Sequence, residues 1–198
     1  MKKQSSKKPL RKVRERIVLL GEGKTEWFYF DYLKKTLSFD LNPSLPRPKN
    51  SDYKKILLEA RRLLREGFDK VICIFDYDKV REDHREEEFS RDMNGLDERI
   101  SVLLSMPCIE FWFFLHSWPS LQTKLYETYD QIVAALKKIF PDYEKTCKYY
   151  RGPFFSRLEA NGGRERAVEY ARKLDTLREQ KETDISFSEI YRIFDILQ

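Results

Sequence analysis

Three short apolar runs in the chain have the pattern of buried β-strands. Residues 16–20 are rich in β-branched residues and leucine and stop at Gly-Glu-Gly, while residues 70–75 are apolar from Val71 onward and end in Asp-Tyr-Asp. A third run, residues 100–104, ends shortly before Pro107. Runs of this length that do not alternate with polar residues indicate strands covered on both faces of a parallel sheet.

Apolar residues recur at helical spacing between the first two runs. One predicted helix extends to about residue 37, with Thr25 as its cap, and a second follows a cap at Ser51 or Asp52 and stops at Gly67. Residues 38–50 contain three prolines, which exclude a helix, and a short strand near residues 39–41 is compatible with this segment.

The pattern after Pro107 is helical. It predicts an aromatic-rich helix to about residue 117 and further helices at residues 129–140, 163–179 and 186–196. Residues 79–98 are strongly charged and are expected to be helix or loop. Together these elements predict an α/β fold: a mostly parallel sheet with helices on both faces and a C-terminal helical layer. Because no linker divides residues 15–198, we expect them to form a single domain.

The charge of the chain is concentrated at its N-terminus. The net charge is +5, but residues 1–16 carry eight basic side chains against one acidic one, a net +7, which leaves −2 for the rest. Residues 1–14 are therefore predicted to be a disordered basic arm that either holds nucleic acid non-specifically or simply aids solubility. With 41% hydrophobic and 14% aromatic residues, the remainder has enough apolar side chains to form a core.

Cysteine content and hydropathy bear on the location of the protein. Cys73, Cys108 and Cys147 are too few and too scattered for a disulfide framework or a paired zinc motif. The longest apolar runs are too short for a signal-peptide core or a membrane span. We therefore expect a cytoplasmic, soluble protein with no membrane partner.

Acidic side chains directly follow the two best predicted strands. Glu22 follows the first, with Glu26 one helical turn later, and Asp76 and Asp78 follow the second. Because parallel strands end at the same edge of a sheet, where ligands bind in such folds, these carboxylates are expected to meet there. Oxygen-only ligands suit Mg²⁺ or Mn²⁺. The plainer alternative is that aspartates after strands form turns and cap helices.

Two motifs carry a resemblance to known families. A strand followed by Gly21-Glu22-Gly23-x-Thr25-Glu26, with a later strand ending Phe75-Asp76-x-Asp78, resembles a Toprim domain, the metal-binding unit of topoisomerases, primases and related nucleases. The segment Ser105-x-Pro107-x-x-Glu110-x-Trp112, followed by Leu115-His116, resembles the signature of RloB-like proteins, a Toprim-related family encoded with bacterial restriction and abortive-infection systems. The resemblance extends over residues 15–196.

The resemblance implies roles for particular residues in a Toprim-like fold. Glu22 would be the general acid or base and a metal ligand, Asp76 and Asp78 would bind Mg²⁺ or Mn²⁺, and Glu110 would be a further ligand or a loop anchor. Glu26 and Ser105 are expected to contact and position these residues without taking part in metal binding or catalysis themselves. The chain departs from the signature at Met106 and Ile109, where the family usually has Asn and Phe. This change puts in doubt an amide hydrogen bond near the site but removes no expected metal ligand.

Basic side chains are candidates for binding phosphate. Lys24 is expected to approach a substrate phosphate and assist catalysis, although no P-loop precedes it. Arg151 and Arg164 lie in segments that suit either a phosphate clamp or an ordinary surface loop and helix start. His116 is a candidate phosphate contact or proton carrier, with helix-end packing as its alternative. The aromatic residues 111–114 are expected to fill a core rather than to stack on bases.

The leading hypothesis is a metal-dependent nucleic-acid phosphodiesterase, a nuclease acting in bacterial antiphage defence as the resemblance implies. One alternative is a non-catalytic nucleic-acid-binding sensor or adaptor subunit of a defence complex, with a partner protein. Another is phosphoryl or nucleotidyl transfer without nucleolysis. The sequence leaves open whether the nucleic acid is DNA or RNA, because it contains no recognisable base-reading module.

Overall fold

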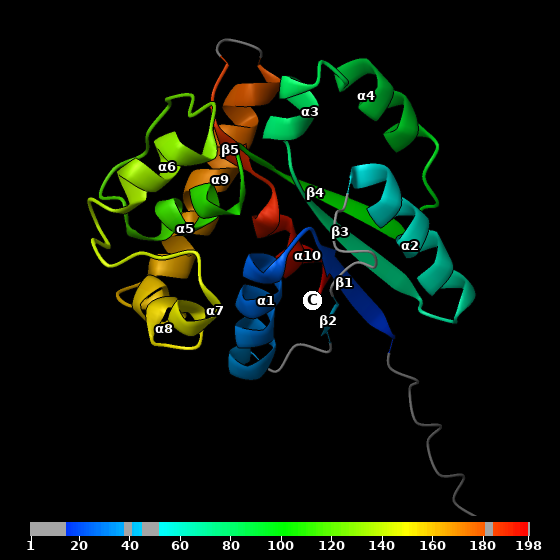
Figure 1. Ribbon diagram of the computed structural model, residues 1–198, viewed down its shortest axis with the longest axis horizontal. Helices are drawn as coiled ribbons and strands as arrows, with labels where there is room; N and C mark the ends of the chain where they lie inside the picture. The colour runs from blue at the N-terminus through cyan, green and yellow to red at the C-terminus, as the bar shows by residue number, and fades with distance from the viewer. Residues whose placement is uncertain (1–14, 38–40, 45–51, 181–183, 198) are drawn as a thin grey trace, which may run out of the picture.

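The computed structural model of the protein describes residues 15–37, 41–44, 52–180 and 184–197 (Figure 1). Within these residues, one five-stranded sheet has the order β2-β1-β3-β4-β5. Four strands run parallel: β1 (Ile17–Gly21), β2 (Leu41–Ser44), β3 (Lys70–Asp76) and β4 (Ile100–Met106). The short β5 (Phe187–Ser188) pairs antiparallel with β4. The predicted mostly parallel sheet is therefore confirmed, and the chain has a mixed α/β fold.

Helices cover both faces of the sheet, as the alternation of strands and helices predicted (Figure 1). One face is covered by α2 (Tyr53–Arg65), α3 (Asp78–Glu82) and α4 (Glu86–Asn94). The other face carries the larger layer, which consists of α1 (Lys24–Leu37), α5 (Ile109–Ser117), α6 (Tyr129–Leu136), α7 (Cys147–Tyr150), α8 (Phe154–Glu159), α9 (Gly163–Glu179), the 3₁₀ helix η1 (Ile190–Arg192) and α10 (Ile193–Ile196).

Alternation along the central strands divides the core into two clusters. In β1, Leu19 faces the larger core while Leu20 faces the smaller one, and in β3 Ile72 and Cys73 divide in the same way. Successive side chains of a strand point to opposite faces, so an entirely apolar strand needs cover on both. All five residues of β1 are buried, which explains why its sequence shows no polar alternation.

The aromatic helix α5 lies at the centre of the larger cluster. Phe111, Trp112, Phe113 and Phe114 have no exposed surface, and α9 packs along the helix. A helix that is apolar on every side is a buried helix. The preference for core packing over base stacking at these residues is therefore confirmed. In the described part of the chain, no helix has both the length and the apolar character that crossing a membrane requires.

The C-terminal segment differs from the prediction. A helix over residues 186–196 is wrong: residues 187–188 form β5, and only the short η1 and α10 follow. β5 covers the edge of β4 that β3 leaves open, and the backbone N–H of Glu189 donates to the carbonyl of Leu104 at 2.8 Å. The Ser105 and Ser188 hydroxyl groups also lie 2.8 Å apart across this pair. Pairing with β4, which is distant in sequence, therefore determines that residues 187–188 form a strand, and the local helical spacing does not.

Three further expectations need correction. The helix predicted at residues 129–140 ends at Leu136, and α7 and α8 were not predicted. Thr25 does not cap α1, because the helix begins at Lys24 and the Thr25 side chain is buried inside the first turn. The Glu26 carboxylate instead accepts a hydrogen bond from the Gly23 N–H at 2.8 Å. Asp52 does cap α2, by accepting from the Lys54 N–H at 3.1 Å.

Several expectations fall wholly or partly outside the described residues. These are the basic arm at residues 1–14, the alternative cap Ser51 and most of the strand predicted at 39–41. The observed strand, β2, begins at Leu41 and pairs only with β1, at the edge of the sheet. An edge position explains how a strand can contain Pro43, since a proline donates no hydrogen bond to a neighbouring strand.

Candidate active site at the carboxyl ends of the strands

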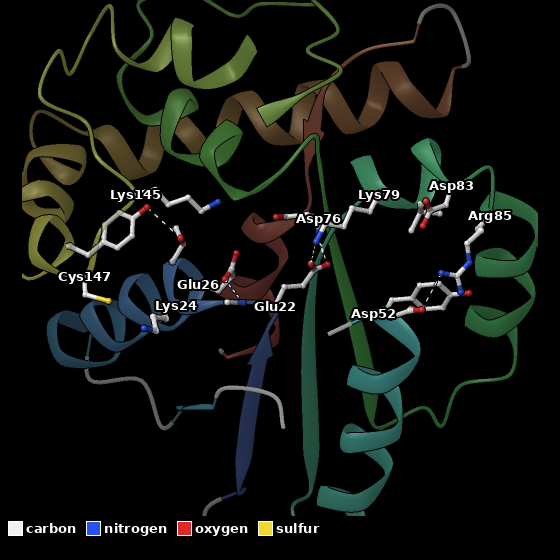
Figure 2. A pocket seen from close by; sticks show the side chains of 15 residues that line it. Glu22, Lys24, Glu26, Asp52, Asp76, Lys79, Asp83, Arg85, Lys145 and Cys147 are labelled. Atoms are coloured by element: carbon white, nitrogen blue, oxygen red, sulfur yellow. Dashed lines mark hydrogen bonds and ion pairs between the residues drawn. The ribbon is translucent and has the colours of Figure 1, made fainter. Parts of the chain in front are cut away.

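A cleft of about 740 Å³ opens where β1 and β3 end. Figure 2 shows Glu22 and Asp76 near its centre, with Lys24, Lys145 and Cys147 on one side and Asp52, Asp83 and Arg85 on the other. The predicted meeting of acidic side chains at this edge of the sheet is thus present in the structure. The cleft is bordered by the start of α1, the start of α2, helix α3 and the segment that leads into α7.

Glu22 is held in place by the tight turn between β1 and α1. A Cβ atom at Gly21 would lie 2.4 Å from the Cβ of Glu26, so only glycine fits at that position. The Glu22 Oε1 atom accepts a hydrogen bond from the backbone N–H of Asp76 at 3.0 Å. This bond joins the ends of β1 and β3, and it holds the Glu22 carboxylate against the backbone of Asp76.

Asp76 connects the end of β3 with the start of α5. Its Oδ1 atom accepts a hydrogen bond from the backbone N–H of Ile109 at 3.1 Å. The carboxylate therefore satisfies one of the amides that a helix leaves unpaired at its N-terminus. The helix-capping alternative considered for the aspartates is correct for one oxygen of Asp76, although the residue also lines the cleft.

Glu110 lies in the first turn of α5 and has no exposed surface. Its Oε1 atom accepts from the Tyr143 hydroxyl at 3.0 Å and forms an ion pair with the Lys145 Nζ atom at 3.0 Å. Its Oε2 atom is buried and has no hydrogen-bond partner among the residues that the structure describes. Because an unpaired buried carboxylate oxygen is costly, this atom marks a place where a donor or a cation would be stabilising.

Burial and crowding shift the ionisation of these carboxylates. Burial, with smaller contributions from the charges of Glu26 and Asp78, raises the pKa of Glu22 to about 7. Burial and the charge of Glu110 raise the pKa of Glu26, and burial together with Glu26, Glu22 and Glu110 raises the pKa of Asp76 well above its usual range. Removing water disfavours the charged form, and neighbouring negative charges add to the effect. A bound cation would relieve both.

Basic side chains share the cleft with the acids. Lys24 and Lys145 line one side of it, and the Lys79 Nζ atom lies 3.9 Å from Glu22 Oε2. At the far end, the Arg85 guanidinium pairs with Asp52 at 3.1 Å and lies over the Tyr53 ring at 4.9 Å. Cations next to a carboxylate cluster are what a site for a phosphate ester and a metal ion requires.

Asp78 and Ser105, like Glu110, lie close to the cleft without lining it. Asp78 is the first residue of α3, and its carboxylate accepts a hydrogen bond from the Lys79 N–H at 2.7 Å. Ser105 is buried in β4, where its carbonyl accepts from the Tyr77 N–H at 2.8 Å. Ser105 thus stabilises the turn that follows Asp76 through its backbone carbonyl. The Asp78 carboxylate instead binds the backbone at the start of α3.

His116 and Arg164 belong to a separate buried cluster. His116 is fully buried, with Nδ1 2.8 Å from the Trp112 carbonyl and Nε2 3.7 Å from Glu159 Oε1, and Glu159 forms an ion pair with Arg164. The structure therefore does not bring these two side chains to the cleft, and packing accounts for their positions. Arg151 is exposed beside the Phe28 ring, one residue after Tyr150, which lines the cleft.

Sequence reasoning missed Tyr143 and Lys145, and it considered the segment that contains Tyr150 and Arg151 only as a phosphate clamp or a surface loop. Tyr143, Lys145 and Tyr150 lie around Glu110, and the two tyrosine hydroxyl groups are 2.8 Å apart. The sequence signal of Tyr143 and Lys145 is the interleaving of lysines and tyrosines over residues 143–150. Asp52 and Arg85, at the other end, carried no signal beyond a helix cap and a charged run.

The comparison with protein families decides the relationship of this chain. The family model described as RloB-like protein matches residues 17–197, nearly the whole chain. The chain belongs to the RloB-like family. The resemblance inferred from the Ser105–His116 segment is therefore confirmed. Searches of curated proteins and of solved structures found no match to this RloB-like protein. The description of its fold as Toprim-like accordingly stays a prediction.

The carboxylates of this RloB-like chain fit a Mg²⁺ or Mn²⁺ ion that uses few protein ligands. Among the described residues, no three His, Cys, Asp or Glu side chains form a ready-made set of metal ligands. Mg²⁺ commonly takes only one or two carboxylates and completes its octahedron with water and substrate phosphate. Glu22 and Asp76 line the same cleft and would hold such an ion, and the charge of Glu110 acts on Asp76 from the first turn of α5.

Proposed function

We propose that this RloB-like protein is a divalent-metal-dependent nucleic-acid phosphodiesterase. The observation that carries the proposal is the carboxylate cluster at the ends of β1 and β3, where Glu22 and Asp76 are joined by a hydrogen bond inside a cleft also lined by lysines. Carboxylates that are buried together, with raised pKa values, characterise sites that bind cations or transfer protons. An extended cleft with basic side chains accommodates a phosphodiester chain.

In this proposal each residue has a distinct task. Asp76 and Glu22 would hold Mg²⁺ or Mn²⁺, with Glu110 as a further acceptor and Asp78 close by. The ion, when bound, would polarise the scissile phosphate and lower the pKa of an attacking water. Glu22 would also accept a proton from that water or return one to the leaving oxygen. Lys24 and Lys79 would neutralise charge that develops on the phosphate.

The biological setting proposed for this activity is bacterial antiphage defence, on the basis of family membership. The substrate is DNA or RNA, and a partner protein of the defence system would supply the trigger. The site geometry itself bears only on the chemistry, because the same fold can serve several activities.

The test is a cleavage assay on the full-length protein. Plasmid DNA, single-stranded DNA and total transfer RNA are incubated with Mg²⁺, Mn²⁺ or EDTA, using wild type, Glu22→Gln and Asp76→Asn. Cleavage is expected only with metal, and both variants should lose it by about a hundredfold or more, the contribution of a positioned acid–base group. Glu98→Gln, an exposed carboxylate remote from the cleft, serves as the control and should retain full activity.

A second candidate is a non-catalytic nucleic-acid-binding sensor or adaptor. Two observations favour it: one oxygen of Asp76 is already engaged by the Ile109 N–H, and Glu110 is already paired with Lys145. Wild-type protein that binds Mn²⁺ and nucleic acid but cleaves none of the three substrates would select this candidate over the nuclease.

A further inference from the structure

Lys145 is the basic residue most closely associated with the acidic cluster. Its Nζ atom lies 3.0 Å from Glu110 Oε1, and its charge also acts on Glu26 and Asp76. Glu110 is fully buried, whereas 41% of the Lys145 side-chain surface is exposed. The ammonium group therefore enters the cluster from the solvent side of the cleft, the side from which a metal ion would also arrive.

The backbone around Lys145 is fixed, while its side chain is 41% exposed and its ammonium group also lies over the Tyr129 ring at 4.5 Å. Lys145 lies in the irregular segment between α6 and α7. The Tyr143 side chain, two residues earlier, is buried and bonded to Glu110, and Thr146 caps α7 by accepting from the Tyr149 N–H at 3.2 Å. A lysine carries its charge on a flexible four-carbon stem. Its ammonium can therefore leave Glu110 by side-chain rotation alone, without any change in the fold.

A single ammonium group does not satisfy the cluster. Lys145 and Tyr143 both bind the Oε1 atom of Glu110, and the Oε2 atom remains buried without a partner. A divalent cation would supply twice the charge at the same place. Lys145 and the cation then compete for the same carboxylate charge.

We propose that Lys145 is a built-in counter-ion, which neutralises the carboxylate cluster in the metal-free protein and leaves Glu110 when a divalent cation binds. The inference deepens the proposed function, on whose metal site it rests. Once released, the ammonium group faces the cleft beside Lys24, where a substrate phosphate would lie. Metal binding would thus prepare the site for an anionic substrate as well as supply the ion.

The test measures metal affinity and does not depend on catalysis. Mn²⁺ alone is titrated into wild type, Lys145→Met and Lys145→Arg by calorimetry at neutral pH. Removal of the competing charge should tighten Mn²⁺ binding by about fivefold or more in Lys145→Met, within the usual range of coupling between two ligands. Lys145→Arg, which keeps the charge, should bind Mn²⁺ as wild type does.

Lys148→Met is the matched control. It removes the same charge three residues away, from an exposed position that does not line the cleft. Its Mn²⁺ affinity should equal that of wild type. A second measurement is the melting temperature in EDTA and in Mg²⁺. Lys145→Met should melt lower than wild type in EDTA and gain more than wild type from Mg²⁺, because it lacks its internal counter-ion.

The outcomes separate this inference from the proposed function. Equal Mn²⁺ affinity in Lys145→Met and Lys148→Met, or weaker binding in Lys145→Met, overturns the counter-ion role whether or not the protein cleaves nucleic acid. Tighter binding in Lys145→Met by a protein that cleaves no substrate supports the counter-ion role and rejects the nuclease. Absence of Mn²⁺ binding to every variant overturns both.

Discussion

Glu22 illustrates how a single carboxylate gains its chemistry from its neighbours. The sequence around it, Gly-Glu-Gly after an apolar strand, permits a sharp turn but contains no information on solvation. In the folded protein Glu22 lies beside Asp76 and near Glu26, and burial raises its pKa from 4.5 to about 7. Because Glu22 is neutral below about pH 7 and charged above it, the free energy of unfolding of the metal-free protein should depend on pH.

The ionisation of Glu22 should make the metal-free protein less stable as the pH rises. Because the folded-state pKa of Glu22 exceeds the unfolded value of 4.5, the folded protein binds the proton more tightly. The resulting stability is complete below about pH 4.5 and disappears as the pH rises through about 7. In EDTA at pH 8, Glu22→Gln should therefore be more stable than wild type by about 1–3 kcal/mol, measured by urea unfolding. At about pH 4, below both pKa values, the two should be nearly equal.

The same experiment includes its own control. Glu98→Gln removes an exposed carboxylate and should follow wild type at both pH values. Glutamine keeps the oxygen that accepts from the Asp76 N–H, so the variant removes the charge and little else. Finding Glu22→Gln less stable than wild type at pH 8 would mean that the ionised carboxylate is stabilised by its surroundings, contrary to the raised pKa.

At the scale of elements, β5 and η1 are held to α9 by a network of charges. Asp175 in α9 is 5% exposed and accepts hydrogen bonds from the Tyr191 hydroxyl at 2.7 Å, from Arg178 at 2.6 Å and from Arg192. Arg178 also pairs with Glu189, whose Oε2 atom accepts from the Leu104 N–H at the edge of β4. This network explains how a two-residue strand is retained at the edge of the sheet.

Breaking the network should loosen the C-terminal segment. Although burial opposes ionisation, the hydrogen bonds from Arg192 and Tyr191 hold the pKa of Asp175 below its usual value. Its stabilising effect is therefore present at neutral pH and is lost as the pH falls through that lowered value. Asp175→Asn should destabilise the protein by about 2–4 kcal/mol at pH 7, measured by chemical unfolding.

A nearby residue provides the comparison for this prediction. Asp195 forms an ion pair with Arg172 at 2.7 Å, but both side chains are about half exposed. Exposed pairs contribute little, so Asp195→Asn should change the stability by less than about 0.5 kcal/mol. Similar effects of the two substitutions would show that burial of Asp175 does not matter and that the network contributes no more than a surface ion pair.

At the scale of the whole molecule, the charge is unevenly distributed along the chain. Residues 1–14 hold seven basic residues and no acidic one, and the rest of the chain sums to −2. General attraction to nucleic acid is therefore expected from the arm, and the chemistry from the cleft. Attraction of this kind depends on salt, because each neutralised phosphate releases a counter-ion.

Removal of residues 1–14 should weaken binding to duplex DNA and flatten its dependence on salt. The expected change is a decrease of about three to six in the slope of log affinity against log salt, since each contact contributes about 0.9. Fluorescence anisotropy between low and moderate salt measures it. A full-length variant with the seven basic residues replaced by glutamine should behave as the truncation does. An unchanged slope in both would assign the binding to the remainder of the chain.

The amino-acid pattern alone predicts the strands β1, β3 and β4, the helix at residues 163–179 and the meeting of Glu22 with Asp76. These features follow from local periodicity and from one general rule, that parallel strands end at a common edge. The family could also be recognised, because its signature lies in one continuous segment around Glu110. Each of these inferences needs only residues that are close in sequence or placed by the same sheet.

The folded arrangement was needed to show which charged residues share a site. It placed Lys145 and Tyr143 against Glu110, enclosed His116 and Arg164 in a separate buried cluster, and turned a predicted helix into β5. The physical reason is the same in each case. The free energy of a buried charge or of an unpaired strand edge depends on partners distant in sequence, and no local pattern of residues specifies those partners.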